Sequence, residues 1–263
     1  MKKKLIVIML FLIPALSRGM PLCEEDILIY LFPGQGADER LFKHLELPPG
    51  YDTVYISYPV PDKKETLAEY ALRFIAQINQ SRPYILLGVS LGGMICTELS
   101  DTIEPLRTIL ISSAKSVDEL PGRYTFQQNF PLNRIIPKGI TKGGAMILQG
   151  IVEPDRKHDK ETFREMLKAK DPLYLKRTVD MIINWDRSSW SEQIIHIHGN
   201  KDHTIPIKNI HYNYLIEEGS HMMMITRAGE INQIIDNILQ ELSGVSFLPP
   251  DLACRHTWTK HFC

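Results

Sequence analysis

The chain has 263 residues, of which 44% are hydrophobic and 23% are charged, a composition typical of a globular protein with one substantial core. Its 30 basic and 31 acidic residues give a formal net charge of −1, without a basic stripe that would neutralise phosphates. The composition therefore argues against nucleic-acid binding and is consistent with one core domain that contains an insertion.

The first 19 residues are typical of a bacterial secretory signal rather than of the fold. A basic start, Met1–Lys4, precedes an apolar run from Leu5 to Leu16. Small residues at Ala15 and Ser17 then predict cleavage after Ser17. A helix over the apolar run would span about 18 Å, short of the roughly 30 Å hydrocarbon core of a membrane. We therefore expect export to the periplasm or beyond, without a stable membrane span in the mature chain. If the segment is instead a buried first strand, the chain is cytoplasmic.

Short apolar runs alternate with helical patterns from residue 27 onward. Six runs bounded by Gly, Pro, Asp or Asn predict strands that are buried on both faces, as in a parallel sheet. They are Ile27–Phe32, Thr53–Tyr58, Tyr84–Val89, Arg107–Ser112, Gln193–Ile197 and Tyr212–Ile216. Apolar residues at helical spacing predict helices over Glu65–Ile78, Leu91–Leu99 and Ala228–Leu242. The alternation predicts an α/β fold with a mostly parallel, doubly wound sheet of about six strands.

Residues 114–191 interrupt this alternation. The segment contains several prolines but no convincing strand, and its clearest helical patterns cover Lys160–Lys170 and Pro172–Trp185. We predict that it forms a helical cap over the carboxyl ends of the strands. Residues 20–113 and 192–242 then form the core, and residues 243–263 form a C-terminal tail.

The four cysteines are too few for a disulfide scaffold. Cys96 falls on an expected helix and should be buried there as an inert core residue. In an exported chain, Cys254 can pair with Cys263, or Cys23 can pair with the tail, and the sequence does not choose between these pairings. The spacing of Cys and His in the tail matches no familiar zinc site, so we expect no metal.

The segment Gly88-Val-Ser90-Leu-Gly92 is the strongest chemical signal in the chain. It lies between an apolar strand and a helical pattern, where a sharp turn would lift a serine hydroxyl above the sheet. Glycines two residues before and after the serine remove side chains that would clash in such a turn. We predict that Ser90 is a nucleophile; the alternative is an ordinary glycine-rich turn.

A serine hydroxyl needs a base to become a good nucleophile, and the base needs an acid to orient it. Asp202 follows the strand expected at residues 193–197, and His221 follows the next strand. The order Ser90, Asp202, His221 therefore predicts a nucleophile, an orienting acid and a base.

Other groups compete for a role in the site. Asp118, after the fourth strand, is the fallback orienting acid. His196 and His198 alternate along a strand, as two metal ligands would, although His198 more simply belongs to the turn before Asp202.

Two backbone amides are expected to stabilise a developing oxyanion. One belongs to Leu91, directly after the nucleophile. The other, which we place at Gln35, belongs to the glycine-containing loop after the first strand. Gly34 in that loop and Trp185 in the cap are predicted substrate contacts.

Residues 27–242 resemble the α/β-hydrolase superfamily, and their order of elements is similar to that of its capped, esterase-like serine hydrolases. The resemblance rests on the turn at Ser90, the acid loop His198–Pro206, and Gly219-Ser220-His221 before a terminal helix. Two departures are Pro33-Gly34 in place of the common His-Gly, and the lack of the usual opening antiparallel hairpin. The resemblance implies hydrolysis of a small-molecule carboxylic ester or thioester without metal or organic cofactor.

Two alternatives stay open at this stage. The same groups can act in C–C bond, amide or peroxy-acid chemistry, or the chain can be a binding protein on a hydrolase scaffold. An intact set of Ser90, Asp202 and His221 argues against a protein without turnover. The natural substrate, the preferred acyl chain and the oligomeric state do not follow from the sequence.

Overall fold

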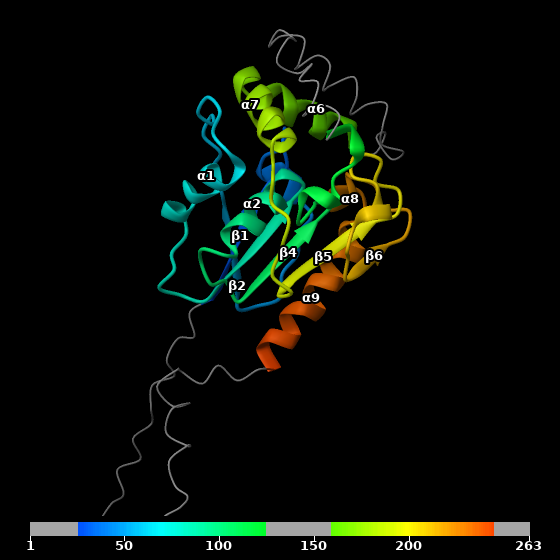
Figure 1. The fold of residues 1–263 in the computed structure, drawn as a ribbon. Helices are drawn as coiled ribbons and strands as arrows, with labels where there is room; N and C mark the ends of the chain where they lie inside the picture. Colours follow the sequence, from blue (N-terminus) through cyan, green and yellow to red (C-terminus); the bar gives the residue numbers. More distant parts are fainter. Residues whose placement is uncertain (1–25, 125–158, 245–263) are drawn as a thin grey trace, which may run out of the picture.

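The computed structural model describes residues 26–124 and 159–244, arranged as Figure 1 shows. Several predictions lie outside the described residues: the signal at residues 1–19, residues 125–158 of the cap, the tail from residue 245, and Cys23, Cys254 and Cys263.

Six strands form one sheet in the order β2-β1-β3-β4-β5-β6, and every neighbouring pair is parallel. The strands are β1 (Ile27–Phe32), β2 (Tyr51–Tyr55), β3 (Tyr84–Val89), β4 (Arg107–Ile111), β5 (Ile194–Gly199) and β6 (Tyr214–Ile216). The chain order reverses between β1 and β3, which are neighbours in the sheet. The carboxyl ends of two strands at such a reversal point are where open α/β sheets bind their ligands. The predicted parallel α/β sheet is therefore confirmed, and its topology brings the loops after β1 and β3 together.

Helices cover both faces of the sheet. They are α1 (Leu67–Leu72), α2 (Leu91–Leu99), α6 (Lys160–Ala169), α7 (Pro172–Ile183), α8 (Met223–Thr226) and α9 (Ala228–Gly244), with short 3₁₀ turns at Glu39–Phe42, Ile75–Gln77, Val117–Glu119 and Ile207–Asn209. Tyr30 and Phe32 of β1 pack with α1 and α2, whereas Ile29 and Leu31 of the same strand pack with α8 and α9. In β1 and β3 both faces are largely buried and nearly every residue is apolar, which is the pattern that predicted these strands. The edge strand β2 is only partly buried and runs over Tyr51–Tyr55, earlier than the predicted Thr53–Tyr58.

The helix expected over Glu65–Ile78 is shorter in the structure, because α1 ends at Leu72. Thr66 and Glu69 form a capping box that sets its first turn. Beyond α1 the chain tightens into i→i−3 hydrogen bonds, such as the one from the Phe74 N–H to the Ala71 carbonyl (3.0 Å). This tightening accompanies the complete burial of the Phe74 ring against Phe32.

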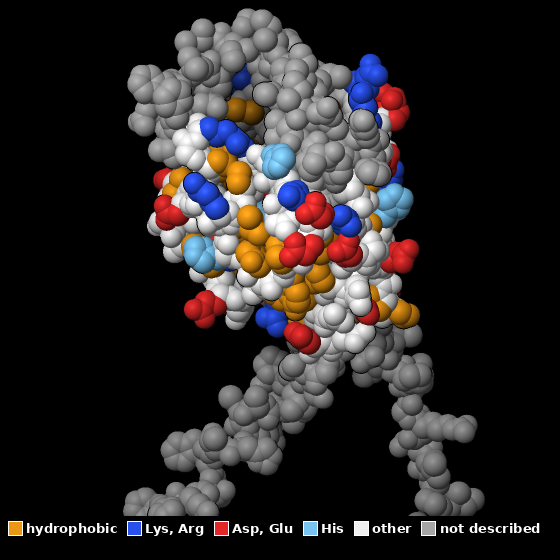
Figure 2. Space-filling model, turned by 90° about the vertical axis from the view of Figure 1, so that its right-hand side faces the viewer, with side chains coloured by type: hydrophobic (Ala, Val, Ile, Leu, Met, Phe, Trp, Pro, Cys, Tyr) orange, Lys and Arg blue, Asp and Glu red, His pale blue; other side chains and the backbone are white. Residues whose placement is uncertain are grey.

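The two described helices of the insertion, α6 and α7, lie side by side above one end of the sheet (Figure 1). The side chain of Gln35, which follows β1, contacts α7, so this is the carboxyl end of the strands. No helix among the described residues is long and apolar enough to cross a membrane. On the face shown in Figure 2, basic and acidic side chains are interspersed.

Candidate active site

The chain turns sharply from β3 into α2 at Ser90, whose φ of 55° and ψ of −120° are unusual for a non-glycine residue. A side-chain carbon on Gly88 would overlap with the backbone of Gly92, and one on Gly92 would overlap with the carbonyl of Phe32. The two glycines are therefore required by close backbone approach, as the sequence predicted. Strained backbone of this kind persists only where the surrounding structure enforces it.

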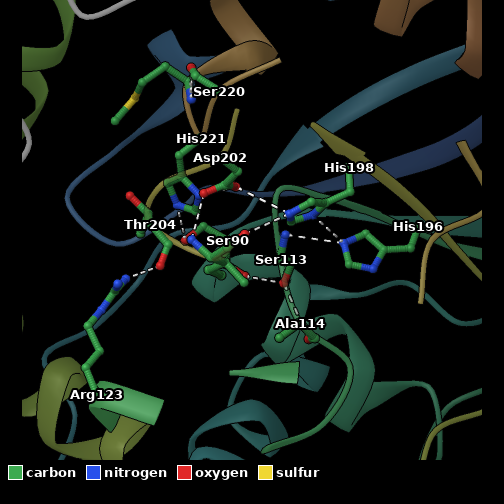
Figure 3. Close-up of polar contacts among 12 residues, drawn as sticks. Ser90, Ser113, Ala114, Arg123, His196, His198, Asp202, Thr204, Ser220 and His221 are labelled. Carbon is green, nitrogen blue, oxygen red and sulfur yellow. Dashed lines mark hydrogen bonds and ion pairs between the residues drawn. The ribbon is translucent and has the colours of Figure 1, made fainter. Parts of the chain in front are cut away.

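The strand β4 supports the backbone of Ser90 from behind. The Ser90 N–H donates to the carbonyl of Ile111 (3.0 Å), and the Ser113 hydroxyl donates to the carbonyl of Ser90 (2.7 Å). Figure 3 shows Ser113 on the sheet side of Ser90. No sequence pattern pointed to this role of Ser113, because a serine after a strand is too common to single out.

His221 and Asp202 come from the loops after β6 and β5, and dashed lines in Figure 3 join His221 to Asp202 and to Ser90. The Nε2 atom of His221 lies 3.0 Å from the Ser90 hydroxyl oxygen. Its Nδ1 atom lies 2.8 Å from Oδ2 of Asp202. Both distances are hydrogen-bond lengths, so the structure brings together the three residues that the sequence singled out.

Backbone hydrogen bonds fix the two loops that present Asp202 and His221. The Lys201 N–H donates to the carbonyl of Gly219 (2.9 Å) and joins the loops to each other. The Met222 N–H donates to the Ser220 hydroxyl (2.9 Å), which closes a tight turn around His221. The position of the His221 imidazole therefore depends on both loops, the one after β5 and the one after β6.

The carboxylate of Asp202 is almost fully buried, at 2% exposure. Burial alone would raise its pKa, but the charge and hydrogen bond of His221 outweigh burial and hold the pKa below its ordinary value. The Ile205 N–H also donates to Oδ1 (2.7 Å). Asp202 is therefore ionised at neutral pH and stabilises the tautomer of His221 that carries its proton on Nδ1. The side chain of the fallback acid, Asp118, is exposed instead.

Both segments with expected oxyanion donors lie next to Ser90. Leu91 is the first residue of α2, where an N–H has no acceptor within its own helix. A side-chain carbon on Gly34 would lie 3.2 Å from Cβ of Ser90, so the loop after β1 passes directly over the serine. The Ala37 N–H donates to the carbonyl of Gly34 (3.0 Å) and closes a turn that contains Gln35.

This combination of sheet order, strained turn and loop placement agrees with a comparison of the sequence with protein families. The model of the alpha/beta hydrolase family matches residues 9–234. The chain belongs to this family. Membership supports hydrolase activity in general.

Solved structures show the same alpha/beta hydrolase fold at low sequence identity. A thermophilic esterase from Thermogutta terrifontis has a TM-score of 0.62 and 14% identity, over 82% of this chain and 90% of the esterase. An enol-lactonase from Burkholderia xenovorans has a TM-score of 0.61 and 15% identity, over 82% and 92%. An esterase from Exiguobacterium antarcticum has a TM-score of 0.60 and 15% identity, over 83% and 92%. No curated protein matches the sequence.

Two buried histidines lie behind the acid of this alpha/beta hydrolase, a contact that the sequence did not predict. His198 Nε2 lies 2.9 Å from the carbonyl of Ile205 and 3.7 Å from Oδ2 of Asp202. Its Nδ1 lies 3.3 Å from Nε2 of His196 (Figure 3). Burial lowers the pKa of both imidazoles, that of His196 well below its ordinary value, so both are neutral at neutral pH. Among residues 26–124 and 159–244, no group of three or more His, Cys, Asp or Glu side chains is placed to bind a metal ion.

Trp185 lies away from the Ser90 hydroxyl, at the other end of α2. Its side chain is 2% exposed, and its indole N–H donates to Glu98 (2.6 Å). Glu98 is eight residues after Ser90, which corresponds to about 12 Å along a helix. Packing accounts for this tryptophan, and a contact with substrate stays an untested prediction.

Proposed function

We propose that this alpha/beta hydrolase cleaves a carboxylic ester or thioester through an acyl-enzyme on Ser90. The observation that supports the proposal most strongly is the continuous line of hydrogen bonds from Asp202 through His221 to the hydroxyl of Ser90. A serine with a base at 3.0 Å and an ionised acid behind that base has the parts that acyl transfer needs.

In the first half of the reaction, Ser90 Oγ attacks the carbonyl carbon of the substrate while its proton moves to Nε2 of His221. Asp202 stabilises the imidazolium that forms through the Nδ1 hydrogen bond. When the tetrahedral intermediate collapses, His221 returns the proton to the leaving alcohol or thiol, and the acyl group stays on Ser90.

The negative charge of the tetrahedral intermediate falls on the former carbonyl oxygen. We assign its stabilisation to the backbone N–H groups of Leu91 and Gln35, which belong to the two segments beside Ser90. The amino end of α2 adds a favourable partial charge at the same place. Close passage of Gly34 over the serine supports this assignment.

In the second half, His221 removes a proton from water, and the resulting nucleophile attacks the acyl carbon. The acid product leaves as Ser90 regains its proton. Water and the side chains already present supply every proton and electron pair, so the scheme needs neither metal nor organic cofactor.

Esters are the favoured substrate class because solved structures with this fold include proteins described as esterases and an enol-lactonase. Fold alone does not choose a substrate, so amide, C–C bond and peroxy-acid chemistry remain the rivals. A panel of p-nitrophenyl esters, thioesters and anilides separates amide cleavage from ester hydrolysis. Oxidation of bromide in the presence of peroxide and acetate tests peroxy-acid chemistry.

The experiment is steady-state and burst kinetics on short and medium p-nitrophenyl esters with the wild type and a Ser90→Ala variant. The expected result is a burst of one p-nitrophenol per chain, with turnover in Ser90→Ala reduced by about 10³-fold or more. A fluorophosphonate should label Ser90, identified by mass spectrometry.

Ser100→Ala is the matched control, since Ser100 lies at the far end of α2 and donates to the carbonyl of Thr97. It should keep wild-type turnover. If the wild type neither turns over any member of the panel nor reacts with the fluorophosphonate, the proposal fails and a binding protein becomes the better account.

A further inference from the structure

The loop after β1 is held from two sides. On the core side, the Tyr58 hydroxyl donates to the carbonyl of Pro33 (3.0 Å). On the cap side, the amide nitrogen of the Gln35 side chain donates to the Thr178 hydroxyl of α7 (2.6 Å) and to the carbonyl of Leu175 (3.2 Å). The side chain of Gln35 thus contacts the cap, while its backbone lies beside Gly34, the residue that passes over Ser90.

Thr178 is well placed to fix Gln35. Its side chain is fully buried at 0% exposure. Its hydroxyl donates back to the carbonyl of Tyr174 (2.9 Å), so its oxygen lone pairs face outward and accept from Gln35. Without the Thr178 hydroxyl, the half-buried amide of Gln35 keeps only the longer hydrogen bond to the carbonyl of Leu175, so its side chain is held less firmly.

We infer that Thr178 is a positioning residue for the oxyanion hole, and that it acts through the side chain of Gln35. The inference rests on the function proposed above and adds a dependence of the chemical step on the cap. Oxyanion donors stabilise the transition state only when they are already aimed at the developing charge, so a small displacement of the Gln35 amide lowers the rate without weakening substrate binding equally.

Other contacts between the insertion and the core do not involve Gln35. Lys43, after the 3₁₀ turn that follows this loop, pairs with Asp159 and donates to the Thr162 hydroxyl of α6 (3.1 Å). These contacts attach α6 to the core beyond the loop. They provide a control in which a cap contact is removed while the Gln35 side chain keeps its partners.

The experiment compares Thr178→Val, Thr178→Ser and Thr162→Val in the full chain. Thr178→Val keeps the shape of the side chain but removes the hydroxyl, and we expect kcat on a p-nitrophenyl ester to fall by about 10- to 100-fold with KM within about twofold. The affinity for an alkylboronic acid, whose tetrahedral Ser90 adduct mimics the oxyanion, should weaken by a similar factor. Thr178→Ser should restore both values, and Thr162→Val should leave both at the wild-type level.

A double-mutant cycle tests the route through Gln35. Gln35→Ala should lower kcat as Thr178→Val does, and the double variant should lose no more than the worse single variant, because both changes remove the same contact. Additive losses, a failure of Thr178→Ser to restore kcat, or an equal loss in Thr162→Val would overturn the inference. Wild-type kcat and boronate affinity in Thr178→Val would do so as well.

These results are distinguishable from a failure of the proposed function. If the wild type shows neither ester turnover nor a boronate adduct, the proposed acyl-enzyme fails and the inference falls with it. If the wild type is active and depends on Ser90, any of the contrary results above overturns the role of Thr178 alone.

Discussion

At the scale of single residues, close approach of backbone segments around Ser90 limits which amino acids can occupy the neighbouring positions. Gly92 is the tightest case, because a side-chain carbon there would overlap with the carbonyl oxygen of Phe32. We expect Gly92→Ala to lower the free energy of unfolding by roughly 1–3 kcal/mol, since β1 or α2 must shift to accept one carbon. The same shift should lower ester turnover by about 10-fold or more, because it moves the oxyanion loop relative to the serine. Urea unfolding and ester kinetics measure the two effects.

Gly229→Ala is the matched control for this substitution. Gly229 is the second residue of α9, and a side-chain carbon there meets nothing within 4 Å. Alanine should therefore stabilise the chain by up to about 1 kcal/mol through helix propensity and leave turnover unchanged. If Gly92→Ala behaves in the same way as Gly229→Ala, close packing between β1 and α2 is not what determines the position of Ser90.

At the scale of elements, the sequence predicted which strands and helices form better than it predicted where some of them end. The runs at β1 and β3 match the structure at both ends, because apolar residues fill a strand that is buried on both faces. The expected helix over Glu65–Ile78 fails after Leu72, since apolar spacing does not reveal that the chain tightens there as Phe74 is buried. Local patterns report which residues are buried, but not how neighbouring elements compete for the same space.

The strand β5 contains two buried, neutral histidines, His196 and His198. Burial places the pKa of both imidazoles below that of a histidine in an unfolded chain, about 6.5. As the pH falls below about 6.5, the unfolded chain therefore binds more protons than the folded chain, and the free energy of unfolding decreases until the pH reaches the folded pKa values. Each histidine can contribute at most about 1.4 kcal/mol per pH unit to this decrease.

We expect His196→Gln to reduce this acid sensitivity. The measurement is urea unfolding from pH 7.5 to 5, which stays above the region near pH 4 where loss of the Asp202 carboxylate begins to matter. His44→Gln is the control, because the His44 side chain is exposed and its removal changes no buried imidazole. An unchanged slope in His196→Gln would show that His196 is not a source of the acid sensitivity.

At the scale of the whole molecule, the sequence predicted which loops meet but not how the cap attaches. Ser90, Asp202 and His221 follow three parallel strands, and parallel strands bring the loops at their carboxyl ends to one edge of the sheet, so chain order and strand pattern were enough to group them. The contact from Gln35 to Thr178 joins residues that are distant in the chain, and no local pattern marks either residue. Trp185 illustrates the same limit, because an aromatic residue in a cap can line a pocket or anchor the cap.

The structure favours the anchoring role for Trp185. Its indole N–H donates to Glu98 of α2, and Arg187 donates to the other carboxylate oxygen of Glu98 (3.3 Å), so the segment after α7 is attached to the core. Trp185→Phe removes the donor and part of the buried surface, and it should lower the free energy of unfolding by about 1–3 kcal/mol while KM for a p-nitrophenyl ester stays within about twofold. Trp190→Phe, which keeps an aromatic face beneath the Lys115 amine, should cost less than about 1 kcal/mol. A severalfold rise in KM with unchanged stability would instead make Trp185 a substrate contact, because only a residue that touches the substrate changes binding without changing the fold.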